Sequence, residues 1–172
     1  ALALVTGLAG AAPLTLRVAT YNASLNRTSA SGLRTDLASA NNVQAKRVAE
    51  IIQRVNPDVI LINEFDYDAG GVALQRFHDN YLAVSQNGQP ALSFPHRFHP
   101  PVNTGVNPFT VLGTAYDFDN NGATVTTTGT DAYGNDCFGF GWYPGQYGLA
   151  VYSKYPIDAA AARTFQTFLW KD

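Results

Sequence analysis

Residues 58–68 read Asp-Val-Ile-Leu-Ile-Asn-Glu-Phe-Asp-Tyr-Asp. Their apolar run at 59–62, which follows Pro57, is typical of a fully buried strand. The run ends in a cluster of polar and acidic residues that begins with Asn63 and Glu64. Because a carboxylate is rarely buried without a partner, Glu64 is expected at the rim of a sheet, where it faces water or binds a positive charge.

A second strand is predicted over residues 14–21, where apolar side chains recur at every second position. This strand also ends in a polar residue, Asn22. If the two strands are neighbours, the Asn22 amide oxygen and the Glu64 carboxylate converge at one edge of the sheet. Oxygen ligands of this kind suit a hard cation such as Mg²⁺, so Asn22 and Glu64 are candidate metal ligands.

A helix is predicted between these strands, capped by Asn41 or Asn42 and running to about Asn56, where Pro57 stops it. Its apolar face carries Val48, Ile51, Ile52 and Val55. The strand–helix–strand order implies a crossover unit whose helix packs on one face of the sheet.

Residues 23–40 are rich in Ser, Asn, Thr and Gly and are predicted to form a loop at the rim of the site. Asn26 and Arg27 in this loop are candidate contacts for an anionic substrate; the alternative is that they are ordinary polar loop residues. Arg163 opens a strand predicted over 163–170, where it either meets a phosphate or makes a surface salt bridge. The other expected elements are a short helix over 73–81, an irregular segment over 83–116 and a strand over 147–153.

The sequence Asp-Phe-Asp-Asn-Asn-Gly indicates a second group of oxygen ligands. Asp117, Asp119 and Asn121 alternate and are followed by a glycine, as in the first half of a calcium-binding loop. The twelfth loop position is a threonine, which offers no bidentate carboxylate, so Asp131 or Asp136 has to substitute for it. The alternative is a polar β-turn without a metal, because Asp, Asn and Gly favour turns in any case.

The histidines and the cysteine are weaker candidates for chemistry. His78 is expected to be a partly buried helix residue. His96 and His99 are close enough to bracket a metal, but no third ligand is nearby, and hydrogen bonds to the backbone are the alternative. Cys137 has no second cysteine with which to form an internal disulfide and is expected to be a buried, inert thiol.

The composition describes one globular domain. The chain has 172 residues, of which 46% are apolar and 14% charged, and its net charge of −2 gives no basic stripe for nucleic acid. The absence of Met indicates a processed chain or a fragment. Residues 1–13 are small and apolar and resemble the end of a secretory signal, or else form an N-terminal extension of the domain, so the protein is expected to be secreted or periplasmic.

Three blocks carry a resemblance to a known superfamily: Leu-Arg-Val-Ala-Thr-Tyr-Asn at 16–22, Asp-Val-Ile-Leu-Ile-Asn-Glu at 58–64, and Gly-Gln-Tyr-Gly-Leu-Ala-Val-Tyr-Ser-Lys-Tyr-Pro-Ile at 145–157. In this order they resemble the N-terminal half of the endonuclease/exonuclease/phosphatase superfamily, which has the fold of pancreatic DNase. The Asp-rich loop resembles that of some secreted bacterial members. The resemblance implies an α/β (α+β) fold over 14–172, part of a four-layer α/β/β/α sandwich with a mixed sheet flanked by helices.

The resemblance also implies a phosphoesterase, either a nuclease-type phosphodiesterase or a phosphatase, that uses Mg²⁺ or Mn²⁺ and in-line attack by water. Nothing after Lys154 resembles the catalytic His or the Asp-x-Asn element of the superfamily, so whether this chain is an enzyme by itself stays open. A single sheet would leave an apolar face exposed, and we expect a C-terminal half, a second chain or self-association to cover it. The alternative function is a non-catalytic structural or self-assembling module that retains the fold.

Overall fold

A mixed four-stranded sheet forms the centre of the computed structural model, which describes residues 14–167. The strands are β1 (Val18–Leu25), β2 (Val59–Phe65), β3 (His96–Phe98) and β4 (Leu149–Ser153), in the order β1-β2-β4-β3. β1 and β2 are parallel, whereas β4 is antiparallel to both of its neighbours. The sheet and its helices form an α+β fold, as predicted, and the predicted segment 1–13 lies outside the described residues.

The crossover from β1 to β2 is made by α2 (Val43–Val55), which confirms the predicted helix. Asn42 is its N-cap, and its side-chain oxygen accepts a hydrogen bond of 2.9 Å from the Ala45 N–H. Asn56 ends the helix in the left-handed conformation, with φ of 48°. The predicted cap and the break before Pro57 therefore both hold.

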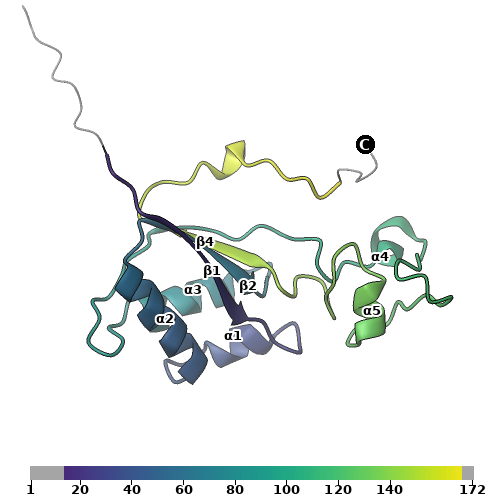
Figure 1. The fold of residues 1–172 in the computed structure, drawn as a ribbon, viewed down its shortest axis with the longest axis horizontal. Coiled ribbons are helices and arrows are strands. Elements are labelled where there is room, and N and C mark those ends of the chain that lie inside the picture. Colours follow the sequence, from purple (N-terminus) through teal and green to yellow (C-terminus); the bar gives the residue numbers. More distant parts are fainter. Residues whose placement is uncertain (1–13, 168–172) are drawn as a thin grey trace, which may run out of the picture.

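Helices cover one face of the sheet. Figure 1 shows α1 (Gly32–Asp36), α2 and α3 (Val72–Phe77) on this face, while α4 (Pro108–Leu112) and α5 (Asp131–Asn135) lie together at one end of the molecule. A π-helix, η1 (His78–Leu82), continues α3. Among residues 14–167, no helix has the length and apolar character needed to cross a membrane.

Aromatic rings fill the core between this helical layer and the sheet. The Phe77 ring lies 5.9 Å from Phe65, 5.9 Å from Tyr81 and 6.1 Å from Tyr152, measured between centroids. All four side chains are fully buried. Since β2, β4, α3 and η1 each contribute one ring, this cluster joins the sheet to the helices that cover it.

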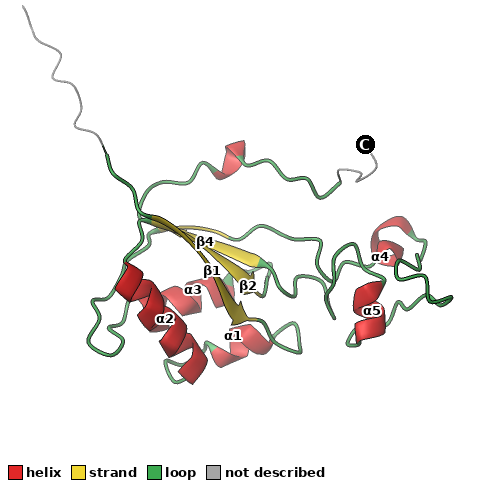
Figure 2. Ribbon diagram, in the orientation of Figure 1, coloured by secondary structure: helices red, strands yellow, loops and turns green. Residues whose placement is uncertain are grey.

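The opposite face of the sheet is less covered in the described part of the chain: it is exposed along β1 and half-buried along β2 and β4. Along β1, exposed and more buried positions alternate, and Val18 on the less covered side is 69% exposed. After β4 the chain continues as an extended segment with a short 3₁₀ helix, η2 (Ala159–Ala161) (Figure 2). Residues 14–167 thus contain one sheet and one covering helical layer of the expected sandwich.

Several predicted boundaries were wrong. β1 starts at Val18 and runs past Asn22 to Leu25, because Ala23 and Leu25 continue the burial of every second side chain. The predicted loop 23–40 therefore contains the end of β1 as well as α1. β4 starts two residues later than predicted, because its pairing with β2 begins at Leu149, opposite Asn63.

The predicted strand 163–170 is not a strand over its described part, 163–167; the remainder lies outside the described residues. Gln166 contacts the chain near β3 through two isolated hydrogen bonds. Its carbonyl accepts one of 2.9 Å from Asn103 Nδ2, and its Nε2 donates one of 3.0 Å to the Pro101 carbonyl. Alternation of side chains alone does not make a strand, because a strand also needs a neighbour for its backbone groups.

Candidate metal centre

Asn22 and Glu64 lie together at one edge of the sheet. β1 and β2 are parallel, with Asn22 paired to Asn63, so the two side chains follow adjacent strands toward the same end. Asn22 Nδ2 donates a hydrogen bond of 2.7 Å to Glu64 Oε1. The proximity expected from neighbouring strands is therefore present.

The backbone around Glu64 is unusual. Glu64 has a φ of +56° and Ser24, on the neighbouring strand, a φ of +48°. The register of β1 against β2 shifts between Asn22 and Leu25, as in a β-bulge. A left-handed non-glycine residue costs on the order of 1–3 kcal/mol and tends to occur at functional sites. The bulge directs Glu64 out of the strand alternation toward Asn22 and the loop that follows β1.

Glu64 is surrounded by neutral hydrogen-bond donors. Besides Asn22, Asn26 Nδ2 donates to Glu64 Oε2 at 3.1 Å, and Ser24 Oγ lies 3.4 Å from the same oxygen. None of the ion pairs among residues 14–167 includes Glu64. A carboxylate beside two amide side chains, each with an oxygen of its own, is a donor set that fits Mg²⁺ or Mn²⁺.

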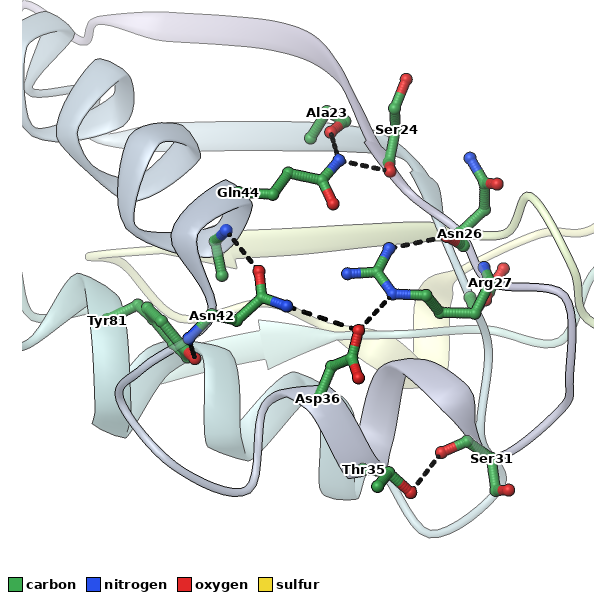
Figure 3. Close-up of polar contacts among 12 residues, drawn as sticks. Ala23, Ser24, Asn26, Arg27, Ser31, Thr35, Asp36, Asn42, Gln44 and Tyr81 are labelled. Carbon is green, nitrogen blue, oxygen red and sulfur yellow. Dashed lines mark hydrogen bonds and ion pairs between the residues drawn. The ribbon is translucent and has the colours of Figure 1, made fainter.

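Arg27 is engaged by the protein itself. Its Nε forms an ion pair of 2.6 Å with Asp36 Oδ2, and its Nη1 donates to the Asn26 carbonyl at 2.7 Å (Figure 3). Asn42 Nδ2 also donates to Asp36, at 3.4 Å. Asn26, Arg27 and Arg163 were the three predicted substrate contacts. Asn26 lies beside Glu64, whereas the Arg27 side chain is paired with Asp36 within the loop that follows β1. Arg163 is exposed on the segment after η2.

Asp66, which was not predicted as a site residue, lies two residues after Glu64 and is buried. It is 3% exposed and accepts hydrogen bonds from the Arg27 N–H, the Tyr143 hydroxyl and the Tyr147 N–H. Burial raises the pKa of its carboxyl, although these three hydrogen bonds oppose the shift. The sequence offers one indication of these contacts: Asp66 is a second carboxylate two positions after Glu64, and a carboxylate at the end of a buried strand also needs a hydrogen-bonding partner.

An acidic cluster that can hold a metal ion lies beside α5. One carboxylate oxygen each from Asp117, Asp119 and Asp136 lies within 4.8 Å of the others. Asp136 is buried, whereas Asp119 is exposed. Asp117 accepts hydrogen bonds from the Asn121 and Gly122 N–H groups, and the Gly122 bond is the main cause of a lowered pKa at Asp117.

Asn121 and Asp131, which were also considered as calcium ligands, make hydrogen bonds within the protein. Asn121 Oδ1 accepts a hydrogen bond of 2.9 Å from the Ala123 N–H, and its Nδ2 donates to Asp119 Oδ2 at 3.0 Å. Of the two acidic residues considered for the missing ligand, Asp136 joins the cluster. Asp131 instead accepts a hydrogen bond of 2.8 Å from Trp142 Nε1.

Comparison with known proteins identifies the family of this chain. A family model described as Endonuclease/Exonuclease/phosphatase matches residues 19–172. The chain belongs to the endonuclease/exonuclease/phosphatase family. Neither the curated proteins nor the solved structures contain a match. The family is a hydrolase family that acts on phosphate esters, and Asn22 and Glu64 both fall inside the matched segment.

In this family member, His78 makes two hydrogen bonds, whereas both buried ring nitrogens of His99 lack a hydrogen-bond partner among the described residues. His78 Nδ1 lies 2.7 Å from Asp79 Oδ1, and its Nε2 accepts a hydrogen bond of 3.1 Å from the Phe94 N–H. The His99 ring packs edge-on against Phe65 and Tyr67. Within residues 14–167, the acidic cluster is the only group of three or more His, Cys, Asp or Glu side chains with metal-ligand spacing, so His96 and His99 belong to none.

His99 makes the stability of the fold depend on pH. Burial lowers the pKa of His99 from 6.5 to about 4, against an opposing effect of Asp68. Above pH 6.5 the imidazole is neutral in both the folded and the unfolded protein. Between pH 6.5 and about 4 the unfolded protein binds a proton at His99 that the folded protein does not bind. The free energy of unfolding should therefore fall by up to about 1.4 kcal/mol per pH unit as pH decreases from 6.5 toward 4.

The measurement is urea unfolding of the wild type and of His99→Gln across this pH range. Comparison with the variant isolates His99 from the carboxylates that titrate in the same range. We expect His99→Gln to lose less stability on acidification than the wild type does. Parallel pH profiles for the two proteins would show that His99 does not contribute.

Proposed function

We propose that this chain is a divalent-metal-dependent phosphoesterase whose cation is held by Glu64 with Asn22 and Asn26. One observation carries the proposal. In this member of the family, the Glu64 carboxylate lies at the edge of the sheet and accepts hydrogen bonds only from the neutral side chains of Asn22, Ser24 and Asn26. A carboxylate that has no cationic side chain as its partner favours a bound cation at this position.

The residues of the site have separable tasks. A bound divalent ion would polarise the phosphate and stabilise charge on the leaving oxygen. Glu64 supplies the negative charge that retains the ion, and Asn22 and Asn26 orient its carboxylate through their Nδ2 groups while their Oδ1 atoms would serve as neutral ligands. Phosphodiesters and phosphomonoesters both fit this chemistry. The choice between them rests on surface loops, which a shared fold does not determine.

Hydrolysis of bis(p-nitrophenyl) phosphate and of p-nitrophenyl phosphate tests this proposal. We expect release of p-nitrophenol in the presence of Mg²⁺ or Mn²⁺, loss of the reaction with a chelator, and recovery when the metal is added back. If the chain hydrolyses either ester and the chelator leaves the rate unchanged, the metal-dependent mechanism is excluded. The faster ester identifies the substrate class.

We also propose that the cluster of Asp117, Asp119 and Asp136 binds Ca²⁺. Ca²⁺ accepts irregular arrangements of many oxygen ligands, and the cluster combines three carboxylates within one loop region. Ca²⁺ at a hundred times its dissociation constant should stabilise the folded state by about 2.7 kcal/mol. We expect this stabilisation in thermal unfolding of the wild type. It should be absent in the Asp117→Asn/Asp119→Asn double variant and retained in Asp131→Asn, the matched control outside the cluster.

The less covered face of the sheet favours a second candidate function, a structural or self-assembling module. Leu14, Leu16 and Val18 are exposed in a row on and before β1. Apolar surface of this kind favours contact with another layer, whether from further polypeptide, a second chain or a second copy. Sedimentation velocity tests this candidate: a concentration-dependent dimer without esterase activity favours the module, and an active monomer excludes it. On the composition of residues 1–13, we propose export as a secreted or periplasmic protein.

A further inference from the structure

Asp66 lies two residues after Glu64, yet its side chain is buried. Its Oδ2 accepts hydrogen bonds of 2.6 Å from the Arg27 N–H and 2.7 Å from the Tyr143 hydroxyl. Its Oδ1 accepts one of 3.1 Å from the Tyr147 N–H. A buried carboxylate is costly, and none of the ion pairs among residues 14–167 compensates this one. The cost indicates that Asp66 does something an apolar residue cannot.

The donors to Asp66 come from two distant segments of the chain. Arg27 follows β1, whereas Tyr143 and Tyr147 precede β4. The Asp66 N–H itself donates to the Leu25 carbonyl at 3.1 Å. One residue therefore ties the ends of β1 and β2 to the approach of β4, at the edge of the sheet where Glu64 lies. An apolar side chain of similar size would fill the space but leave these donors unsatisfied.

Each of the two segments reaches the surroundings of Glu64. The peptide held through the Arg27 N–H begins at Asn26, which donates to Glu64 Oε2. The segment held through the Tyr147 N–H continues into Gly148, whose carbonyl accepts a hydrogen bond of 3.0 Å from Phe65, the residue next to Glu64. Tyr147 has a φ of +57°, so its backbone conformation needs support from its neighbours.

We infer that Asp66 is a positioning residue of the Glu64 cation site. It holds the Asn26–Arg27 peptide and the Tyr147 backbone on either side of Glu64, so that the neutral donors around the Glu64 carboxylate keep their places. Asp66 acts through these segments and is not itself a ligand, because its side chain is buried whereas that of Glu64 is partly exposed. The inference rests on the proposed function, which makes Glu64 the centre of a cation site.

Mn²⁺ binding by the full chain tests the inference without any assay of activity. Free Mn²⁺ is measured by electron paramagnetic resonance during titration of the wild type, Asp66→Asn and Tyr143→Phe. Tyr143→Phe removes only the hydroxyl that contacts Asp66 Oδ2 and lies 3.0 Å from the Arg27 carbonyl. Loss of residues that orient metal ligands typically lowers metal affinity by about 10–100-fold. We expect a loss in this range for Asp66→Asn and a smaller loss for Tyr143→Phe.

Asp58→Asn is the matched control. Asp58 stands at the opposite end of β2 and likewise joins separate segments, with its oxygens accepting hydrogen bonds of 2.8 Å from the Arg17 N–H and 3.1 Å from Lys154 Nζ. This control should lose stability but keep its Mn²⁺ affinity within about twofold, since distant sites act independently.

The outcomes separate the inference from the proposed function. Wild-type Mn²⁺ affinity in folded Asp66→Asn and Tyr143→Phe overturns the inference and leaves the proposed function standing. If Asp66→Asn does not fold, Tyr143→Phe decides. If the wild type does not bind Mn²⁺, or binds it no more tightly than Glu64→Gln does, the cation site is absent and both proposals fall. An equal loss of affinity in Asp58→Asn also overturns the inference, because the effect would then be one of general destabilisation.

Discussion

Replacement of Glu64 by Gln is expected to lower kcat/KM for the preferred p-nitrophenyl ester by about a hundredfold or more in the presence of Mg²⁺. The substitution keeps the size of the side chain, but its single amide oxygen can accept only one of the two hydrogen bonds that Asn22 and Asn26 donate to Glu64. It removes the negative charge that retains the cation. The loss should therefore appear in metal affinity and in turnover together, and excess Mg²⁺ should restore it only in part.

Glu50→Gln is the control for this measurement. Glu50 lies on α2, pairs with Arg54 at 2.6 Å and accepts a hydrogen bond of 3.1 Å from Asn87 Nδ2. The same chemical change there should leave turnover unchanged. If Glu64→Gln retains the Mg²⁺-dependent activity of the wild type, Glu64 is not the cation ligand, and the proposed site is wrong.

Replacement of Phe77 by Ala is expected to lower the free energy of unfolding by about 3–5 kcal/mol. Phe77 is fully buried and contacts rings from both the sheet and η1, so its removal leaves a cavity where these layers join. The loss is a large part of the stability of a domain of this size, and partial unfolding at ambient temperature is the expected consequence. Urea unfolding followed by circular dichroism measures it.

The same substitution at Phe109 provides the comparison. Phe109 is on α4 and 51% exposed, so Phe109→Ala should change the stability far less than Phe77→Ala does. Similar losses at the two positions would contradict the assignment of the core to the aromatic cluster around Phe77.

The elements with strong local signals were predictable from the sequence. The apolar run of β2 predicted a strand, although only Ile60 and Ile62 are buried while Val59 and Leu61 are half-buried, and the Asn42 cap and Pro57 confine α2 between two strands. The strand–helix–strand order predicted a crossover unit, and the parallel pairing of β1 with β2 confirms the condition under which Asn22 and Glu64 were expected to lie close together. Each of these inferences needed only a short segment of sequence and a steric or hydrogen-bonding rule.

The details of the site depend on partners that are distant in the sequence, and these were not predictable. From the sequence, Arg27 was either a contact for an anionic substrate or an ordinary polar loop residue; α1 forms in the predicted loop and places Asp36 against it. Asp66 is stabilised by Tyr143 and Tyr147, which are more than seventy positions away. The extent of β1 was missed because the polar composition after Asn22 indicated a loop, although Ala23 and Leu25 continue the burial of every second side chain.

The strand order β1-β2-β4-β3 has a consequence for the order of folding. β1, α1, α2 and β2 are consecutive in the chain, so this unit forms through short loops and closes early. β3 comes next in the sequence but contacts the sheet only through β4. It therefore has to wait until residues 99–148, with the acidic cluster among them, have closed into a loop. We expect the acidic region to be among the last parts of the chain to gain protection from hydrogen exchange during refolding.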